Sequence, residues 1–253
     1  MPQADIAVVV GSTGAMGQVI VRRLAAQGLR VVAVARSTDA LASLVHSTPG
    51  VVACAADIAS DSATEAIRAT CEQLDAPVRL VVQGAGVATA GGVLTAPTEA
   101  VVDAVNIKVG GMLRLVRAVD GRLSAGARLV AIGGHYGFEP TAYAATAGVA
   151  NAALANLVRQ LSWAYGPRGV TSHLVAPGPA DTERLHRVAN DRAARDGLSA
   201  AEVLDQMRTE SAIGAFTTPE QIAWAIALLL DPEADALAGG TLFMDAGRRK
   251  GLP

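Results

Sequence analysis

Hydrophobic and polar residues alternate along the chain in blocks rather than residue by residue. Short unbroken apolar runs such as Ile6–Val10 are typical of strands buried on both faces of a sheet. The blocks between them carry apolar residues at helical spacing, as at Val19, Ile20 and Leu24. The pattern predicts strands at 6–10, 30–35, 51–55, 79–84, 127–133, 170–176 and 240–244. It predicts helices from the turn after residue 14 to near residue 28 and at 38–46, 61–74, 98–120, 147–166 and 218–230.

Strands that alternate with helices predict right-handed crossovers and a parallel sheet. The expected fold class is α/β, a single-domain Rossmann fold whose doubly wound parallel sheet has about seven strands, with helices on both faces. No repeat or linker divides the chain, so residues 1–253 are interpreted as one domain. Residues 179–217 interrupt the alternation, and one or two short helices are expected there. Because ligands bind beyond the strand ends of such sheets, this insertion is a candidate lid over a substrate.

Composition narrows the range of partners. The 253 residues carry a formal net charge of −2 and a pI near 6.1, which argues against nucleic acid and against an anionic membrane surface. The longest apolar stretch, 222–230, is too short to span a bilayer. A cytoplasmic location is expected, since Cys54 and Cys71 fit buried thiols better than a disulfide or a metal cluster. Only Lys108 and Lys250 stand beside nineteen arginines, so a buried catalytic lysine has few candidates.

A glycine-rich turn joins the first predicted strand to the first predicted helix. Backbone N–H groups and the positive end of the helix dipole bind anions at such a turn, and glycine lets the ligand approach closely. An ordinary tight turn is the alternative, but the position between strand and helix favours a dinucleotide site. The residues expected to contact the cofactor here are Gly11, Ser12, Thr13, Met16 and Gly17.

The end of the second predicted strand bears on the choice between NAD and NADP. An acidic residue there would hydrogen-bond the ribose hydroxyls of NAD, but the chain has Ala35-Arg36-Ser37. Arg36 suits the 2′-phosphate of NADP through charge-assisted hydrogen bonds. A solvated surface arginine is the alternative in so arginine-rich a chain. NADP(H) is therefore favoured over NAD(H).

Several further segments, taken in order with the glycine turn, resemble the short-chain dehydrogenase/reductase family nearly from end to end. Asp57 and Ile58 stand where the family contacts adenine, and Asn106 stands where it has a helical Asn. The stretch 175–182 resembles the segment that faces the nicotinamide. The resemblance implies these further cofactor contacts: Asp57, Ile58, Gly84, Ala85, Asn151, Pro177, Gly178 and Thr182.

The glycine turn departs from the family's usual spacing, G-x-x-x-G-x-G. Gly11 and Gly17 fit this spacing, whereas Ala15 holds the middle position and Gly14 is extra. A methyl group is small, so cofactor binding is expected to survive. The resemblance also implies a small-molecule substrate and a homodimer or homotetramer, with close helix packing at 147–166.

The family's catalytic side chains are missing. In the family a Ser positions the substrate oxygen, a Tyr thirteen residues later exchanges the proton, and a Lys four residues further lowers the Tyr pKa and holds the cofactor ribose. A register anchored at the turns 137–140 and 167–170 puts Gly134, Ala147 and Asn151 in these positions. Ordinary carbonyl reduction is therefore expected to be slow. A wider, more apolar pocket is expected beside the nicotinamide.

Four side chains are candidates for the chemistry that remains. Asn106 is the one family role retained. His135 has a suitable ordinary pKa, but strand alternation would turn it away from the site. Tyr136 is two residues after Gly134, so strand alternation would point both side chains to the same face and let the Tyr136 phenol enter the site. Tyr143 lies about one helical turn before Ala147, and without a nearby cation its pKa is expected to stay near the ordinary value of about 10.

Three functions stay open. The first is an enzyme that uses the family scaffold without its acid–base set, either to reduce a conjugated double bond or for non-redox cyclisation, isomerisation or dehydration of a small apolar metabolite. The composition hints at bacterial secondary metabolism. The second is a catalytically silent nucleotide-binding protein or partner subunit. The third is a conventional NADPH-dependent ketoreductase with an unrecognised proton donor. The insertion at 179–217 favours the first, because a silent binder needs no shaped pocket.

Overall fold

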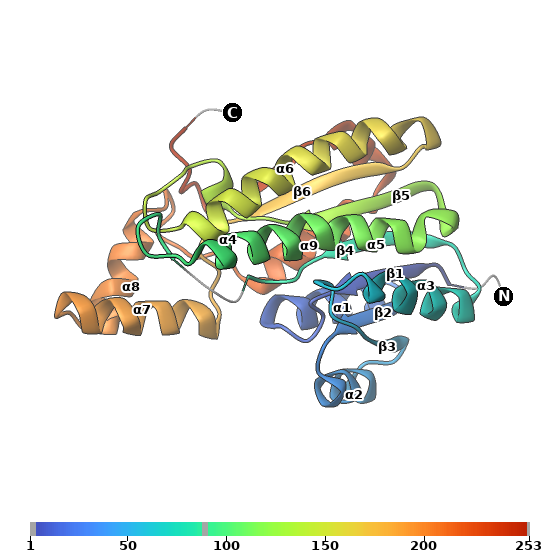
Figure 1. Cartoon of the computed structure of the whole chain (residues 1–253), viewed down its shortest axis with the longest axis horizontal. Helices are drawn as coiled ribbons and strands as arrows, with labels where there is room; N and C mark the ends of the chain where they lie inside the picture. The colour runs from blue at the N-terminus through green and yellow to red at the C-terminus, as the bar shows by residue number, and fades with distance from the viewer. Residues whose placement is uncertain (1–3, 88–90, 252–253) are drawn as a thin grey trace.

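The computed structural model describes residues 4–87 and 91–251. Within these residues one parallel sheet of seven strands forms the middle layer, in the order β3-β2-β1-β4-β5-β6-β7, and helices cover both of its faces (Figure 1). This arrangement confirms the predicted fold class. The strands are β1 (Ile6–Val10), β2 (Arg30–Ala35), β3 (Val51–Ala55), β4 (Val78–Gln83), β5 (Leu123–Ile132), β6 (Thr171–Pro177) and β7 (Thr241–Met244).

The winding direction of the sheet reverses at β1. This strand pairs with β2 on one side and with β4 on the other, so the chain winds outward to β3 and then crosses back. The connections that leave the carboxyl ends of β1 and β4 therefore run to opposite sides. Doubly wound sheets bind ligands in the crevice at such a switch point.

The unbroken apolar runs are explained by burial on both faces of the sheet. In β1, Ile6, Val8 and Val10 belong to one core cluster, whereas Ala7 and Val9 belong to the other. Successive strand side chains point to opposite faces, and all five of these are buried. A strand of this kind needs no polar face, which is why its run is continuous.

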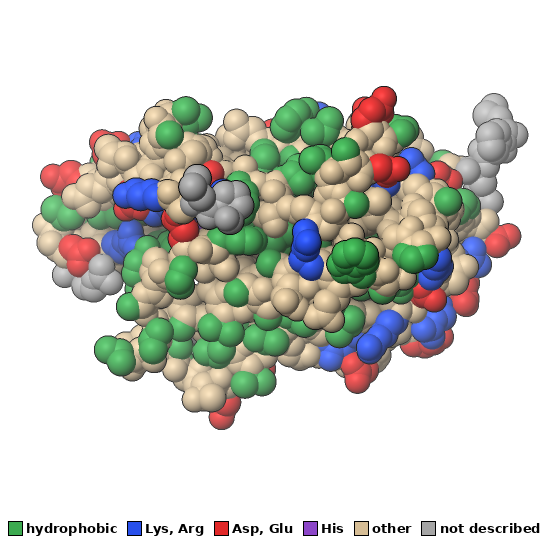
Figure 2. Space-filling model, turned by 90° about the horizontal axis from the view of Figure 1, so that it is seen from above, with side chains coloured by type: hydrophobic (Ala, Val, Ile, Leu, Met, Phe, Trp, Pro, Cys, Tyr) green, Lys and Arg blue, Asp and Glu red, His purple; other side chains and the backbone are tan. Residues whose placement is uncertain are grey.

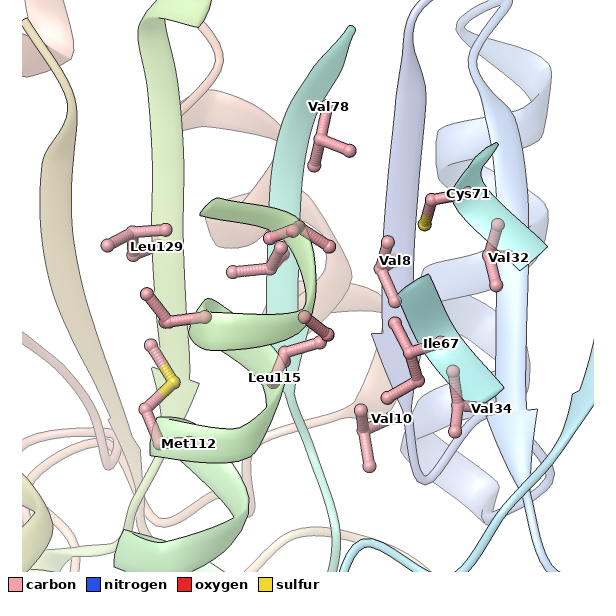
Figure 3. Packing of buried hydrophobic residues seen from close by; sticks show 14 of the residues in the cluster. Val8, Val10, Val32, Val34, Ile67, Cys71, Val78, Met112, Leu115 and Leu129 are labelled. Atoms are coloured by element: carbon pink, nitrogen blue, oxygen red, sulfur yellow. The ribbon is translucent and has the colours of Figure 1, made fainter. Parts of the chain in front are cut away.

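The helices divide between the two faces. On one face α1 (Ala15–Ala26), α2 (Thr38–Ser47) and α9 (Pro219–Leu228) bury Ile20, Leu41 and Ile222 against the sheet. The other face is covered by α3 (Ser62–Leu74), α4 (Thr98–Val105), α5 (Gly111–Val119) and α6 (Ala145–Tyr165). Each fully buried Leu or Ile contributes about 1.5–3 kcal/mol. Figure 3 shows this second core, with labelled side chains Val8, Val10, Val32, Val34, Ile67, Cys71, Val78, Met112, Leu115 and Leu129.

Two predicted elements differ in detail. The helix predicted at 98–120 consists of α4, a π-helical turn η1 (Asn106–Gly110) and α5. Strand β5 begins at Leu123, before the predicted start at residue 127, and its pairing with β4 shifts register between Val78 and Leu80. The early part of β5 is not a buried apolar run, so its pattern did not mark it as a strand.

Residues 179–217 contain two helices, α7 (Glu183–Asp196) and α8 (Ala200–Thr209), which project beyond one end of the sheet (Figure 1). They pack on each other through a small core that includes Leu185, Ala189 and Met207. A capping box at Ser199 starts α8. In the described ranges, no helix combines the length and apolarity that a membrane crossing requires.

Candidate functional site

A cleft of about 670 Å³ opens where the sheet reverses direction. It is bounded by the ends of β1, β2 and β4, the start of α1 and the start of α7. Ten of the predicted cofactor contacts line it: Gly11, Thr13, Met16, Gly17, Arg36, Asp57, Ile58, Gly84, Ala85 and Thr182. The remaining predicted contacts lie outside this lining, namely Ser12, Asn151, Pro177 and Gly178.

Two glycines of the turn are required by contacts with the backbone. Gly11 has a φ of +78°, and a Cβ on it would lie 2.8 Å from the carbonyl oxygen of Gly84. A Cβ on Gly17 would overlap the Gly11 carbonyl oxygen and lie 2.8 Å from the Cα of Ser12. Gly14 has room, because its Cβ would stand 3.4 Å from the Gly11 oxygen. The turn thus depends on Gly11 and Gly17, and the extra glycine is dispensable.

Cationic side chains edge the cleft. Arg36 is exposed just after β2. On α7, Arg184 donates from Nη1 to the carbonyl oxygen of Val87 at 3.0 Å, and Arg187 also lines the cleft. These guanidinium groups complement the negative charge of a nucleotide's phosphates.

Two polar side chains tie η1 to the strand ends beside the cleft. Gln83 donates from Nε2 to the Ile107 carbonyl oxygen at 2.7 Å and accepts at Oε1 from the Ala85 N–H at 3.2 Å. Lys108 is buried, and its Nζ donates to the carbonyl oxygen of Ile132 at 2.8 Å. Lys108 therefore connects η1 to the end of β5, a structural contact close to the site.

Lys108 is expected to titrate far below an ordinary lysine. Burial, and then the guanidinium of Arg184, lower the pKa of Lys108 to about 8. The chain has two lysines, so lysine labelled with ¹⁵N gives two side-chain signals, and Lys108→Met assigns them. Between this pKa and the unfolded value of about 10.4, the unfolded state binds more protons, so Lys108 makes the unfolding free energy rise with pH there. Denaturant unfolding across this window should show the rise, and Lys108→Met should remove it. An ordinary Lys108 titration would contradict this prediction.

Asn106 opens the π-helical turn and is engaged by structural partners. Its Nδ2 donates to the carbonyl oxygen of Ala59 at 2.9 Å, and its Oδ1 accepts from Arg114 Nη1 at 2.9 Å. Arg114 also pairs with Asp61 at 2.6 Å. The side chain thus joins η1 to the loop after β3 and is outside the cleft lining. A catalytic role for Asn106 stays a prediction.

Two of the three positions that are predicted to have lost the family's catalytic side chains lie side by side. A Cβ on Gly134 would lie 2.9 Å from Nδ2 of Asn151. The loss of the catalytic set stays a prediction. Ala147 stands one turn before Asn151 on α6. Asn151 is only 5% exposed, and its Oδ1 has no hydrogen-bond partner among the described residues. The amide of Asn151 fills the space at Gly134 that was expected to widen the pocket.

His135 and Tyr136 lie in a turn, which corrects the reasoning from strand alternation. β5 ends at Ile132, and the 3₁₀ turn η3 (His135–Gly137) follows, so neighbouring side chains there do not alternate between two faces. His135 is buried, with its ring centroid 3.9 Å from that of Tyr136. Burial, followed by the charge of Arg248, lowers the pKa of His135. Its imidazole is therefore held in the neutral form near pH 7.

Tyr136 and Tyr143 meet each other. Their Oη atoms are 3.3 Å apart and their rings pack edge to face, with centroids 5.7 Å apart. Arg192 of α7 lies over the Tyr143 ring, its guanidinium carbon 5.4 Å from the centroid. The expectation that Tyr143 has no nearby cation is therefore wrong. Sequence reasoning missed Arg192, whose position on a helix gives no sign of which distant residue it contacts.

The cysteines and the groupings of His, Cys, Asp and Glu in the described ranges bear on thiol and metal chemistry. Cys54 and Cys71 are buried free thiols, and burial raises the pKa of Cys71 to about 12, which keeps it protonated. No group of three His, Cys, Asp or Glu in 4–87 and 91–251 is arranged to hold a metal ion.

Comparison with known proteins identifies the scaffold. A family model described as enoyl-(acyl carrier protein) reductase matches residues 10–249, nearly the whole chain. The chain belongs to the short-chain dehydrogenase/reductase family. The family predicted from the glycine turn and the strand ends is therefore confirmed.

Relatives and solved structures match this chain over nearly its whole length. The chain is 28% identical to the short-chain reductase protein NovJ of Streptomyces niveus, over 97% of this chain and 94% of that protein. A short-chain dehydrogenase/reductase from Serratia marcescens is 27% identical with a TM-score of 0.85, covering 98% of this chain and 99% of the other. L-sorbose reductase from Gluconobacter frateurii, solved with NADPH and L-sorbose, has a TM-score of 0.91 at 22% identity, covering 99% and 98%. This last likeness supports the fold.

Proposed function

We propose that the chain binds NADP(H) in the cleft and reduces a conjugated carbon–carbon double bond in a small apolar metabolite. One observation carries the proposal: a Cβ on Gly134 would lie 2.9 Å from Nδ2 of Asn151, which fits a register in which Gly134, Ala147 and Asn151 replace the family's Ser, Tyr and Lys. Loss of a general acid typically costs a factor of about 10²–10⁴ in rate. Ordinary carbonyl reduction depends on that acid and is therefore disfavoured. A reaction that places its proton on an atom farther from the hydride-accepting carbon is less affected.

The residues around the cleft fit NADP(H). Gly11 and Gly17 leave a cradle that a Cβ would fill, as close approach of a pyrophosphate requires. Arg36 would hold the 2′-phosphate. The buried Oδ1 of Asn151 needs a donor, and a ribose hydroxyl would supply one. When bound, the cofactor supplies a hydride, and Thr182 stands at the cleft wall on the side of the predicted nicotinamide segment.

The phenols next to the vacant positions support conjugate reduction. Reduction of an isolated carbonyl puts negative charge on the oxygen of the carbon that receives the hydride. Reduction of a conjugated ketone puts it on an oxygen at the other end of the conjugated system. Tyr136 and Tyr143 flank the vacant positions 134 and 147 without occupying them, which fits an acid that serves a more distant oxygen.

A substrate panel tests the reaction class. With NADPH, conjugated enones should be consumed and should yield the saturated ketone, whereas the matching saturated ketones should react slowly. NADPH absorbance gives the rate, and mass spectrometry of the product gives the position of reduction. If saturated ketones are reduced rapidly and both Tyr136→Phe and Tyr143→Phe keep this activity, the protein is a conventional ketoreductase and the proposal is wrong.

Arg36 is expected to determine cofactor preference. Arg36→Ala should weaken NADPH binding about tenfold, since a charge-assisted hydrogen bond contributes about 1.5–3 kcal/mol and this side chain is exposed. NADH affinity should be unchanged. Fluorescence titration measures both, with Arg22→Ala as a control in an exposed arginine outside the cleft lining. Equal affinity of the unaltered protein for NADPH and NADH would contradict the assignment of Arg36 to the 2′-phosphate.

A silent partner subunit is the second candidate, and the vacancies at Gly134, Ala147 and Asn151 favour it directly. Such a protein would bind NADPH, turn over none of the panel and form a stable complex with an active member of the family. Turnover by the purified chain alone would exclude it.

We also propose that the chain forms a homodimer or homotetramer. Val102 on α4 and Val149 and Trp163 on α6 are 61%, 51% and 81% exposed. Figure 2 looks onto the side where α6 lies and shows hydrophobic side chains spread over the middle of that face. Light scattering should give the mass of two or four chains, and Val149→Glu should lower it. A monomer at micromolar concentration would contradict this proposal.

A further inference from the structure

A polar cluster lies outside the nucleotide cleft, where the start of α6 meets α7. It consists of Tyr136 from η3, Tyr143 just before α6 and Arg192 from α7. None of the three lines the cleft. The carbonyl oxygen of Tyr136 would be 3.2 Å from a Cβ on Gly148, the neighbour of the vacant position 147. The cluster therefore lies close to position 147 and outside the lining of the cleft.

The backbone that carries Tyr143 is held firmly. The Val93 N–H donates to the Ala142 carbonyl oxygen at 2.8 Å, and the Ala145 N–H donates to the Gly91 carbonyl oxygen at 2.9 Å. Two backbone hydrogen bonds thus fix the segment on either side of Tyr143. Arg192 comes from the separate α7–α8 segment, so the cation reaches the phenol only while α7 lies against the start of α6.

The surroundings of the two phenols favour ionisation of Tyr143 over ionisation of Tyr136. Burial, and then the contact with Tyr143, raise the pKa of Tyr136 to about 12. Burial also acts to raise the pKa of Tyr143, but the Tyr136 hydroxyl and the Arg192 guanidinium outweigh it, and the net effect lowers this pKa. Once Tyr143 is ionised, Tyr136 is the donor to it, whereas either hydroxyl can donate while both are neutral.

Two further titratable or charged groups face the pair. Arg248, from the C-terminal segment, lowers the pKa of both phenols, although Glu210 pairs with it. His135 packs against Tyr136 within η3, and burial holds it neutral near pH 7. The charges facing the pair therefore favour a phenolate at Tyr143.

We propose that Tyr143 is the proton donor that replaces the Tyr missing at position 147, with Tyr136 and Arg192 as positioning residues. This assignment rests on the proposed function, because it names the acid for that reduction. It makes the α7–α8 segment part of the chemistry, since this segment supplies the cation that the family's Lys supplies from α6.

The proton transfer balances with one hydride. In reduction of a conjugated ketone, the hydride that NADPH would supply forms a C–H bond at the distal carbon of the carbon–carbon double bond. The π pair of that double bond then forms a new double bond to the carbonyl carbon, and the π pair of the carbonyl group moves to its oxygen. The O–H bond of Tyr143 breaks, and its proton goes to this oxygen to give an enol. The phenolate that remains accepts a hydrogen bond from Tyr136 and is stabilised by Arg192. Water then reprotonates Tyr143, and the enol becomes the ketone in solution. The substrate gains two hydrogens, and NADPH becomes NADP⁺.

A phenol titration tests the assignment without any turnover. The chain has only Tyr136, Tyr143 and Tyr165, so ultraviolet absorbance of phenolate resolves few ionisations. We expect one phenol to ionise below the ordinary pKa of about 10 and two above it, because burial and contacts also raise the pKa of Tyr165. Tyr143→Phe should remove the low ionisation, and Arg192→Gln should move it upward. Tyr165→Phe is the matched control and should leave it in place. A low ionisation that survives Tyr143→Phe, or that Arg192→Gln leaves unmoved, would overturn the assignment.

Kinetics with NADPH and an enone provide the second readout. Tyr143→Phe should lower kcat by about 10²–10⁴ while leaving NADPH affinity unchanged. In Arg192→Gln the alkaline limb of the pH–rate profile should move to higher pH, because a weaker acid stays protonated longer. Turnover that Tyr143→Phe does not slow would overturn this inference and leave the proposed reduction standing. An unaltered protein that binds NADPH but reduces no enone would overturn the proposed reduction and, with it, the role of Tyr143.

Discussion

Gly17→Ala is expected to weaken NADPH binding by at least about a hundredfold, whereas Gly14→Ala is expected to leave it nearly unchanged. The Cβ at position 17 would overlap the Gly11 carbonyl oxygen, and both sides of that contact are backbone. No rotamer change relieves the overlap, so the turn must open and its N–H groups must leave their positions. Loss of two hydrogen bonds to a charged phosphate, each about 1.5–3 kcal/mol, weakens binding by about 10²–10⁴.

Gly14 provides the matched control in the same turn. It has a φ of −74° and a ψ of 166°, which any residue adopts, and its Cβ would stand 3.4 Å from the Gly11 oxygen. The alanine variant should therefore change affinity by no more than about twofold, as surface substitutions do. Fluorescence titration with NADPH measures both variants, and thermal unfolding shows whether each is folded. Tight NADPH binding by a folded Gly17→Ala protein would mean that the phosphates bind elsewhere.

The contrast between these glycines shows how far sequence reasoning carries into the fold. The run in β1 and the helical spacing in α1 are local patterns, and the glycine turn lies between them, so their order alone fixes the nucleotide half of the sheet. The first residues of β5 were not predicted as strand because they lack such a local pattern. They include Gly126 with a φ of +79°, pair irregularly with β4 and lack an apolar run.

In the candidate site, too, some residue positions follow from the sequence and others do not. Gly11, Arg36 and Asp57 follow strand ends, and parallel strands bring such ends to one edge of the sheet, so their position in the cleft follows from the chain order. Contacts between helices do not follow from it. The approach of Arg192 to Tyr143 depends on how α7 packs on the rest of the molecule, which is a matter of tertiary structure.

Strand alternation failed at His135 because it assumed a strand where the chain turns. β5 ends at Ile132, and the tight turn η3 brings His135 against Tyr136. The filling of the space at Gly134 by Asn151 was also beyond the sequence, since it requires the side-chain conformation of a residue on another element. The two failures have one cause, namely that His135 lies on a turn and Asn151 on a helix that packs over that turn.

Among the residues that the structure describes, Arg128 is the largest side chain that is fully buried, and its hydrogen bonds explain why a cation is tolerated there. Its Nε donates to the Leu229 carbonyl oxygen at 2.6 Å, and its Nη2 donates to the Asp231 carbonyl oxygen at 3.1 Å. Its Nη1 donates to Thr171 Oγ1 at 3.0 Å and pairs with Asp235 at 2.6 Å. Arg128 thus ties β5 to β6 and to the chain after α9, across the end of the sheet opposite the cleft.

Arg128→Met is expected to lower the unfolding free energy by about 3–5 kcal/mol, because it strands the polar partners of a buried charge. For a chain of this size that corresponds to a fall in Tm of about 6–20 °C. Arg68→Met is the control, an exposed arginine paired with Glu65, and should cost no more than about 1 kcal/mol. Denaturant unfolding measures both. A loss below about 1 kcal/mol in Arg128→Met would contradict this prediction and would show that the former partners of Arg128 hydrogen-bond to water in the variant.

A pH series on the same variant isolates the charge of Arg128 from its packing. Burial, and then this guanidinium, lower the pKa of His173 to about 4. As the pH falls from about 6.5 through 4, the unfolded state takes up a proton that the folded state refuses, so His173 costs stability across that window. Removing Arg128 raises the pKa of His173, and the loss of stability with acid should become shallower even though the variant is less stable at pH 7. An NMR titration of the four histidines follows the pKa directly, with His173→Gln for assignment. An unchanged His173 pKa in Arg128→Met would mean that burial alone sets it.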